Sequence, residues 1–166
     1  PRGTGGSLYP IKKYNSKEFV MVFGDLMFDF DFKRLKYFHL KNKSDLTLVT
    51  HPNDHPRDSD LVGTNNKNQV VQFFKKPHKN RKFLGNLSLS GIFMFNKKIL
   101  SIINKNSSED FCKKTIPTLI KNNFKIFSYN TREYIKDAGT IKRVNQVNID
   151  LRKDLIKKYS IKNKLP

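Results

Sequence analysis

Two aspartates that lie far apart in the sequence share one local pattern, which is a short predicted strand, a carboxylate and a nearby glycine. The apolar run 19–23 leads into Gly24 and Asp25, and the stretch 133–136 leads into Asp137. If both stretches are strands of an open α/β sheet, both carboxylates lie at strand ends, where such sheets bind ligands. Mg²⁺ takes one or two carboxylates together with water and phosphate oxygens. Asp25 and Asp137 are therefore predicted to share one Mg²⁺, the alternative for Asp25 being the cap of a turn.

The other acids and the histidines follow patterns that are typical of structural roles. Asp29 and Asp31 come just before a helical pattern, where capping and the helix dipole favour acids. The segment 51–60, HPNDHPRDSD, contains two histidines and three aspartates, but their spacing fits no metal template and the prolines suit a turn. We interpret it as a loop. A helix-surface histidine, a loop histidine and a core thiol are expected at His39, His78 and Cys112.

Strands that alternate with helices are expected to position these residues. The run 19–23 is predicted to be a strand buried on both faces, because its apolar residues are continuous rather than alternating. Further strands are expected at 45–50, 68–74, 87–95, 125–129 and 133–135, and helices at 32–42, 97–104, 107–123 and 140–159. This alternation predicts a single α/β domain over residues 1–166, with a Rossmann-like mixed and mostly parallel sheet flanked by helices.

The composition is that of a basic globular protein. Of 166 residues, 37% are hydrophobic and 28% are charged, and the formal net charge is +19. The lysines are spread along the chain among asparagines, so two partners stay open: phosphorylated small molecules and nucleic acid. The single cysteine, Cys112, excludes an internal disulfide. No apolar run reaches the roughly 20 residues of a membrane span, and no signal-peptide pattern begins the chain, which favours the cytoplasm.

Several motifs, in order, resemble those of sugar nucleotidyltransferases, also called nucleoside-diphosphate-sugar pyrophosphorylases. The resemblance rests first on PRGTGGSL, FGDLMFDFD and EYIKDAGT. HPNDHPRDSDLV, FFKKPHKN and NLSLSGIFMF narrow it to the branch of D-glycero-D-manno-heptose 1-phosphate guanylyltransferases. It extends from Pro1 to about Tyr159. In some relatives this domain is fused to a heptose bisphosphate phosphatase, and the expected pathway is lipopolysaccharide or capsule nucleotide-sugar biosynthesis.

The resemblance implies a reaction in which a sugar 1-phosphate oxygen attacks the α-phosphorus of a nucleoside triphosphate, GTP in the heptose branch, and pyrophosphate leaves. It implies that Asp25 and Asp137 are catalytic and hold the Mg²⁺ cofactor. The expected substrate-binding residues are a Gly-rich turn near the base, the glycine before the first aspartate, a lysine on the sugar phosphate and a glycine of the sugar pocket: Gly3, Thr4, Gly5, Gly6, Gly24, Lys76 and Gly91. The loop 51–60 would line the sugar site or an interface.

Three features depart from the family pattern. The G-x-G-T-R loop with its following Pro-Lys, which cradles the triphosphate, is not found in the sequence. The N-terminal nucleotide-binding segment is therefore expected to be absent, and this chain alone to be a poor catalyst. Lys75 stands where the family usually has Glu, and Leu89 where it often has Asn. The alternative functions are a non-catalytic binding or regulatory remnant and a basic nucleic-acid-binding protein.

Overall fold

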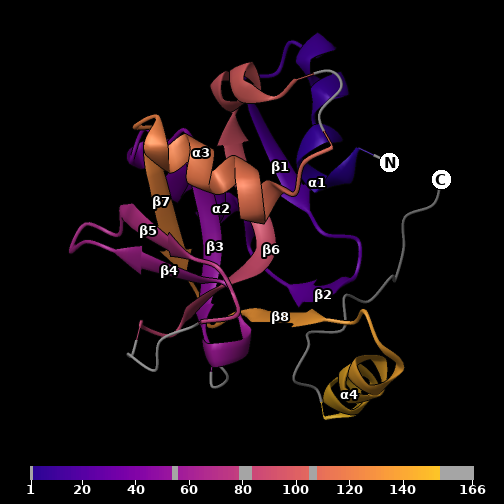
Figure 1. The fold of residues 1–166 in the computed structure, drawn as a ribbon. Helices are drawn as coiled ribbons and strands as arrows, with labels where there is room; N and C mark the ends of the chain where they lie inside the picture. Colours follow the sequence, from indigo (N-terminus) through magenta and orange to yellow (C-terminus); the bar gives the residue numbers. More distant parts are fainter. Residues whose placement is uncertain (1, 54–55, 79–83, 105–107, 154–166) are drawn as a thin grey trace, which may run out of the picture.

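A six-stranded sheet and a two-stranded ribbon organise the structure, a computed structural model that describes residues 2–53, 56–78, 84–104 and 108–153 (Figure 1). The strands are β1 Glu18–Val22, β2 Leu26–Asp29, β3 Leu46–Pro52, β4 Leu61–Thr64, β5 Val70–Phe74, β6 Leu87–Asn96, β7 Ile126–Asn130 and β8 Tyr134–Asp137. The α-helices are α1 Gly3–Gly6, α2 Phe32–Lys41, α3 Ile116–Lys121 and α4 Ile141–Arg152. Shorter helical turns are η1 Tyr9–Lys13, η2 Pro56–Asp58, η3 Lys97–Ile102 and η4 Phe111–Thr115.

The sheet is mixed and flanked by helices, as expected, but it is not mostly parallel. Its strand order is β5-β4-β6-β3-β7, with β1 also beside β6. Among the described strands, β3 and β7 run parallel, whereas β1–β6, β3–β6, β4–β5 and β4–β6 are antiparallel. The short connection 65–69 between β4 and β5 is one that only an antiparallel pair can use. The sequence pattern missed the four-residue strands β2 and β4.

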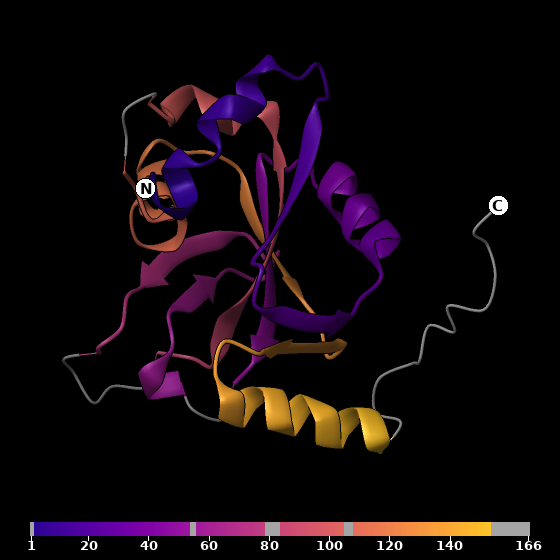
Figure 2. The same ribbon diagram turned by 90° about the vertical axis from the view of Figure 1, so that its right-hand side faces the viewer.

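Two hydrophobic cores lie on opposite faces of the sheet. Side chains alternate along β6, so Phe93 and Phe95 belong to one core while Ile92 and Met94 belong to the other. Helix α2 contributes the fully buried Leu35 to the second core, whereas η4 and α3 cover the first. Figure 2 shows α2 on one side of the sheet and α1 on the other, with α4 below the sheet. The helices thus leave β2, β8 and α4 together at one end of the molecule.

Two expectations about burial are wrong. Strand β1 is not buried on both faces, since Val20 is 47% exposed and β1 pairs, among the described strands, with β6 alone. His39 does not lie on the helix surface; it is buried, and its Nδ1 lies 2.8 Å from Thr47 Oγ1. Burial lowers the pKa of His39. Asp31 does cap α2, because its carboxylate accepts hydrogen bonds from two backbone amides of the first turn.

The later helices differ from their expected limits. The helix predicted at 107–123 begins later than expected, because Asp110 is the N-cap of η4, which continues into α3. Helix α4 begins at the expected cap, Thr140, and the part of the predicted helix beyond residue 153 lies outside the described residues. Ile141 and Val144, the first two apolar residues of α4, are 83% and 41% exposed, so the buried face of the helix begins after them, at Val147.

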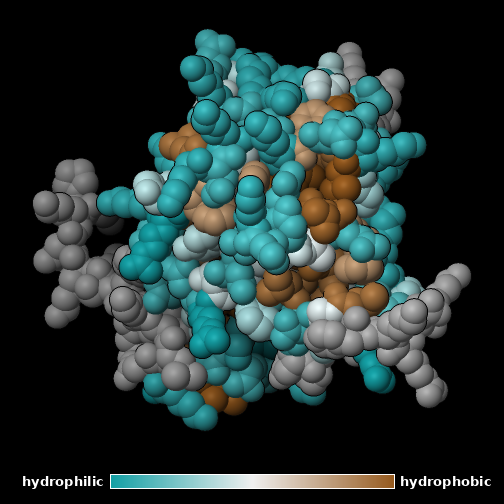
Figure 3. Space-filling model, turned by 90° about the vertical axis from the view of Figure 1, so that its left-hand side faces the viewer, coloured by the Kyte–Doolittle hydropathy of each residue, from teal (hydrophilic) through white to brown (hydrophobic). Residues whose placement is uncertain are grey.

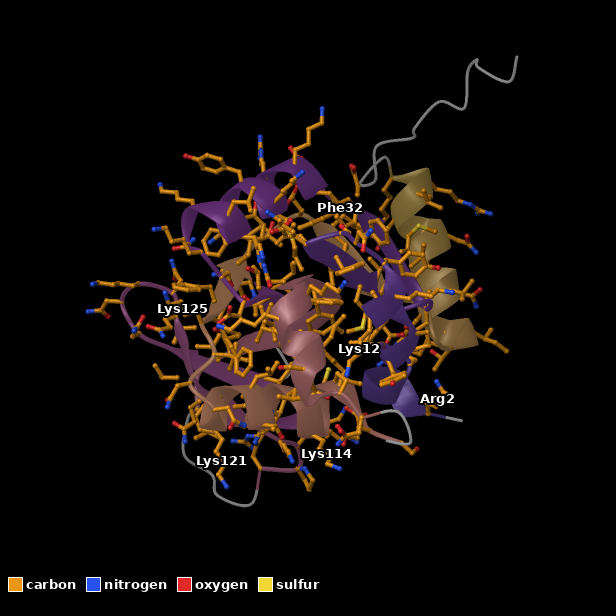
Figure 4. The ribbon with its side chains drawn as sticks, turned by 90° about the horizontal axis from the view of Figure 1, so that it is seen from above. Arg2, Lys12, Phe32, Lys114, Lys121 and Lys125 are labelled. Carbon is orange, nitrogen blue, oxygen red and sulfur yellow. The ribbon has the colours of Figure 1, made fainter. Side chains whose placement is uncertain are left out.

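The surface carries many charged side chains, and the cations among them come from several elements. Figure 3 shows a largely hydrophilic face with hydrophobic side chains gathered in one band. In the view from above, the labelled cations are spread over several elements rather than aligned in one tract: Arg2, Lys12, Lys114, Lys121 and Lys125 (Figure 4). Within the part of the chain that the structure describes, no helix combines the length and apolarity needed to cross a bilayer.

Candidate active site

The ribbon of β2 and β8 brings the two predicted Mg²⁺ ligands together. Asp25 directly precedes β2, and Asp137 ends β8. In the antiparallel register of the ribbon Leu26 lies opposite Asp137, and the Ala138 amide donates a hydrogen bond of 2.6 Å to the Asp25 carbonyl oxygen. The two aspartates are therefore neighbours through an antiparallel ribbon, not through the ends of two parallel strands as the sequence pattern suggested.

Gly139 leaves open the space that both carboxylates face. A Cβ at this position would lie 3.0 Å from Asp137 Oδ1 and 3.1 Å from Asp25 Oδ2. The Gly139 amide donates to Asp137 Oδ1 at 2.7 Å, which fixes the orientation of that carboxylate. Sequence reasoning noted this glycine only as the start of a helix and missed that its lack of a side chain opens a space between the two acids.

The residues around this space can be compared with the ligands that a divalent cation requires. Within the described residues no group of three or more His, Cys, Asp and Glu side chains could hold a metal ion, so a cation here would depend on two carboxylates. Mg²⁺ commonly binds through one or two carboxylates and completes its shell with water and phosphate oxygens. Asp25 and Asp137 offer such a donor set, and Gly139 leaves the room that it needs.

Arg143 also belongs to this cluster, and sequence reasoning did not single it out. Its Nη1 donates to Asp137 Oδ2 at 2.6 Å, and the side chains of Arg143 and Asp137 are 56% and 45% exposed. Thr140 caps α4 as expected, since its hydroxyl oxygen accepts from the Arg143 amide at 3.3 Å. The spacing from Thr140 to Arg143 could have indicated this contact. A residue three positions after an N-cap lies in the first helical turn, close to the residues that precede the helix, here Asp137.

A cavity of about 310 Å³ opens beside the two aspartates. Four of the predicted site residues line it: Asp25, Lys76, Gly91 and Asp137. The other lining residues are Phe23, Leu26, Ser59, Asp60, Ser88, Leu89, Ser90, Cys112 and Arg143. Three carboxylates and two cations therefore face one another here, and one divalent cation would change the formal charge of the lining from −1 to +1. Such a balance suits a site that holds phosphate groups and a metal ion together.

The cavity lies where the edge of β6 passes from one neighbouring strand to another. Strand β4 pairs with β6 at Ser88, and β1 pairs with it from Ile92 onward. Gly91 lies between them with φ +85°, and a Cβ there would be 3.0 Å from side-chain atoms of Phe23 and Leu26. Glycine is therefore required at 91 by backbone conformation and by space. The Ser88 hydroxyl is buried and finds no hydrogen-bond partner among the described residues.

A second cavity, of about 370 Å³, also reaches Asp25. It is lined by Thr4, Ser7, Met21, Val22, Phe23, Gly24 and Asp25. Gly24 lies in open space, since no heavy atom would come within 4 Å of a Cβ there, and its φ is not in the left-handed region. A left-handed backbone conformation is therefore not what requires glycine at position 24. The open space around Gly24 would instead let a ligand approach the backbone closely.

The Gly-rich turn 3–6 forms α1 and packs closely against the segment before η4. Gly3 has φ +63°, and a Cβ there would lie 2.5 Å from the Glu109 carbonyl oxygen. The Gly5 amide donates to that oxygen at 2.7 Å, and Gly6 is buried beside it. The Thr4 hydroxyl accepts from the Phe111 amide at 2.8 Å. Small residues are thus needed here for packing, whereas Thr4 also lines the second cavity.

The segment 51–60, predicted to be a loop, begins in the last two residues of β3 and includes the short turn η2; its end and Cys112 contribute to the wall of the first cavity. Ser59 and Asp60 line it, and Asp60 Oδ1 accepts from the Lys76 amide at 2.9 Å. Residues 54 and 55 lie outside the described residues. Burial raises the pKa of the Cys112 thiol to about 12, which agrees with the expected core thiol.

A buried carboxylate attaches α4 to β8. Asp150 is 3% exposed and accepts hydrogen bonds from Tyr134 Oη at 2.8 Å and Gln146 Nε2 at 2.9 Å. Lys136 Nζ lies 2.7 Å from Asp150 Oδ2. Hydrogen bonds from Lys136, Gln146 and Tyr134 hold the pKa of Asp150 down at about 2. Because Lys136 precedes Asp137, this network sets where α4 and its Arg143 lie relative to the second aspartate.

One protein family matches most of the chain. The family described as Nucleotidyl transferase matches residues 1–154. Glucose-1-phosphate adenylyltransferase from Geobacillus stearothermophilus is 30% identical over 161 aligned positions, which cover 90% of this chain and 41% of that protein. The chain therefore spans about two-fifths of the length of the curated relatives that it matches.

Solved structures share the fold. The crystal structure of HddC from Yersinia pseudotuberculosis matches with a TM-score of 0.73 at 22% identity, covering 91% of this chain and 63% of that one. The crystal structure of HddC complexed with GMP-PN matches with a TM-score of 0.72 at 21% identity over the same shares. At such identities the likeness concerns the mixed sheet and its flanking helices.

Proposed function

Because this chain belongs to the nucleotidyl transferase family, we propose that it transfers a nucleoside monophosphate from a nucleoside triphosphate to a sugar 1-phosphate, with release of pyrophosphate. The observation that carries the proposal is the pair of carboxylates, Asp25 and Asp137, which face one open point beside a cavity that also contains Lys76 and Arg143. Such a site suits two reactants that are both rich in phosphate.

The reaction makes modest chemical demands on the protein. An oxygen of the sugar phosphate forms a bond to the α-phosphorus of the triphosphate, and the bond from that phosphorus to the bridging oxygen of pyrophosphate breaks. Catalysis of this kind depends on alignment of the reactants and on compensation of their negative charge. A Mg²⁺ ion held by Asp25 and Asp137 would supply a large part of that compensation. Lys76 and Arg143 would add fixed positive charge on the same cavity.

The two cavities that Asp25 lines suggest where each of the two reactants would bind. The cavity with Lys76 and Gly91 would take the sugar 1-phosphate, because its cations suit a phosphate and its serine hydroxyls suit a sugar. The cavity with Thr4 and Gly24 would take the nucleotide. Asp25 lines both cavities, so reactants bound in this way would bring their phosphates together beside it.

We propose guanylyl transfer to a heptose phosphate as the specific reaction. The support is the sequence resemblance in 51–62, 73–80 and 86–95, together with the shared fold of HddC, which has been crystallised with GMP-PN. The curated relatives are named for adenylyl transfer to glucose 1-phosphate, so the two pairs of substrates must be compared directly.

The test is an assay of pyrophosphate release by the natural protein that contains this chain. Each of the four nucleoside triphosphates is combined with heptose 1-phosphate or glucose 1-phosphate and Mg²⁺. We expect Asp25→Asn and Asp137→Asn to lower the rate by about 100-fold or more, because each removes one carboxylate from the shared point. Asp31→Asn is the matched control, since asparagine still caps α2 and the same charge is lost outside the cavity.

Two outcomes would contradict the proposal. Absence of pyrophosphate with every pair of substrates would favour the binding or regulatory alternative. Equal rates for the wild type and both cavity variants would show that the reaction does not depend on the carboxylate pair.

A further inference from the structure

The guanidinium group of Arg143 has N–H donors that its ion pair with Asp137 does not use. The guanidinium group carries five N–H donors in a planar arrangement. Among the described residues, the side chain of Arg143 makes one hydrogen bond, from Nη1 to Asp137 Oδ2. More than half of the side chain is exposed, and Arg143 lines the same cavity as Lys76. The edge of the guanidinium that does not contact Asp137 is therefore open to a ligand in that cavity.

The ion pair by itself does not explain an arginine at this position. Asp137 already has a donor on its other oxygen, the Gly139 amide at 2.7 Å. A half-exposed ion pair contributes little to the stability of a protein, because water screens the two charges. A planar donor that holds a carboxylate with one edge can hold a phosphate with the other, and this geometry distinguishes arginine from lysine.

The helix that carries Arg143 is held in place independently of this pair. Asp150, near the other end of α4, is buried and accepts from Tyr134 and Gln146 while it pairs with Lys136. At the near end, Thr140 caps the first turn. The backbone of Arg143 thus keeps its position at the cavity when the side chain changes partners, which limits the entropy that binding a ligand would cost.

We propose that Arg143 binds a phosphate group of the substrate and links it to Asp137. This inference rests on the proposed function, because it assigns Arg143 to the phosphates that meet beside the two aspartates. It also names a residue outside the set that the sequence motifs indicated. The positive charge of Arg143 would compensate for phosphate charge next to the metal ligands, and its fork would orient the phosphate.

The experiment measures phosphate binding directly, without turnover. The purified chain is titrated with inorganic phosphate in the presence of Mg²⁺, and the dissociation constant is read from backbone amide NMR shifts. We expect Arg143→Gln to weaken binding at least about tenfold, which corresponds to about 1.4 kcal/mol. Arg143→Lys keeps the charge but loses the fork, and we expect a loss of about threefold or more. Lys142→Gln is the matched control, since it removes the same charge from the adjacent exposed position outside the cavity lining, and it should change the constant by less than about twofold.

A purely structural role for Arg143 gives a different result. In that case Arg143→Gln lowers the thermal midpoint or changes the affinity for Mn²⁺, but the phosphate dissociation constant equals that of Lys142→Gln. That outcome, or a wild-type chain that binds no phosphate at millimolar concentrations, overturns the inference. If Arg143→Gln fails to fold, Arg143→Lys decides alone, and wild-type affinity in that variant counts against the proposal.

The two proposals fail in different assays. No pyrophosphate release with any pair of substrates would overturn the transferase, whereas the phosphate titration would still decide whether Arg143 is a phosphate-binding residue.

Discussion

Gly139→Ala tests whether the space between the two aspartates is the metal position. The added methyl carbon would lie 3.0 Å from Asp137 Oδ1 and 3.1 Å from Asp25 Oδ2, which is closer than an ordinary carbon–oxygen contact. Both carboxylates must move apart by a few tenths of an ångström, and the methyl group occupies the point that they shared. Mg²⁺ demands near-ideal geometry at about 2.0–2.1 Å, so a shift of this size removes at least one ligand. We expect the affinity for a divalent cation to fall by about 10- to 100-fold, or about 1.4 to 2.8 kcal/mol.

The assay is titration of the purified chain with Mn²⁺, a paramagnetic substitute for Mg²⁺, followed by electron paramagnetic resonance. Gly63→Ala is the matched control, since its methyl group would also be crowded, 3.3 Å from the Phe74 ring, but on β4 and outside the lining of both cavities. It should change the thermal midpoint at least as much as Gly139→Ala while leaving Mn²⁺ affinity intact. Wild-type Mn²⁺ affinity in Gly139→Ala would refute the assignment of the metal to this point.

Two further predictions concern titratable groups. The pKa of Asp150 is lowered to about 2 by its bonds from Lys136, Gln146 and Tyr134, so its contribution to stability is present above the unfolded pKa of about 3.9 and is lost as pH falls through the folded pKa. The thermal midpoint of the wild type should therefore fall more steeply between pH 4 and pH 2 than that of Asp150→Asn, and parallel curves would contradict this. Burial raises the pKa of Cys112 to about 12, so alkylation by iodoacetamide at pH 8 should be roughly a thousandfold slower in the folded than in the unfolded chain, whereas similar rates would mean that the thiol is accessible and ionised.

Local sequence patterns predicted an element correctly where its own residues are enough to define it. The helix after Asp31 begins at its predicted cap, and the strand predicted at 45–50 is found as β3, Leu46–Pro52. The same reasoning failed at His39, whose neighbours in sequence are mostly exposed while its partner, Thr47, comes from a strand. It also failed for the direction of most strand pairs, since apolar alternation is the same in parallel and antiparallel neighbours.

Among the site residues, the sequence predicted those that lie within a recognisable motif. Asp25, Lys76, Gly91 and Asp137 all line one cavity. The turn at 3–6 was indicated by its glycines, yet their contacts to the Glu109 backbone give Gly3 and Gly5 a packing reason that no local pattern contains. Ser88 lies within the motif stretch 86–95 but was not singled out, and Arg143 lies outside every motif, so only their neighbours in space make them candidates.

The amino-acid sequence by itself indicated the family through the resemblance of its motifs. It also predicted most of the helices and strands, and two acids suited to a divalent cation, from side-chain type and short-range spacing. The three-dimensional structure decided that the acids meet at Gly139, through an antiparallel ribbon between segments from opposite ends of the chain. It also placed Arg143 against Asp137 by attaching α4 to β8 through the buried Asp150. Contacts between residues far apart in sequence depend on strand pairing and helix docking, which hydrophobic periodicity does not specify.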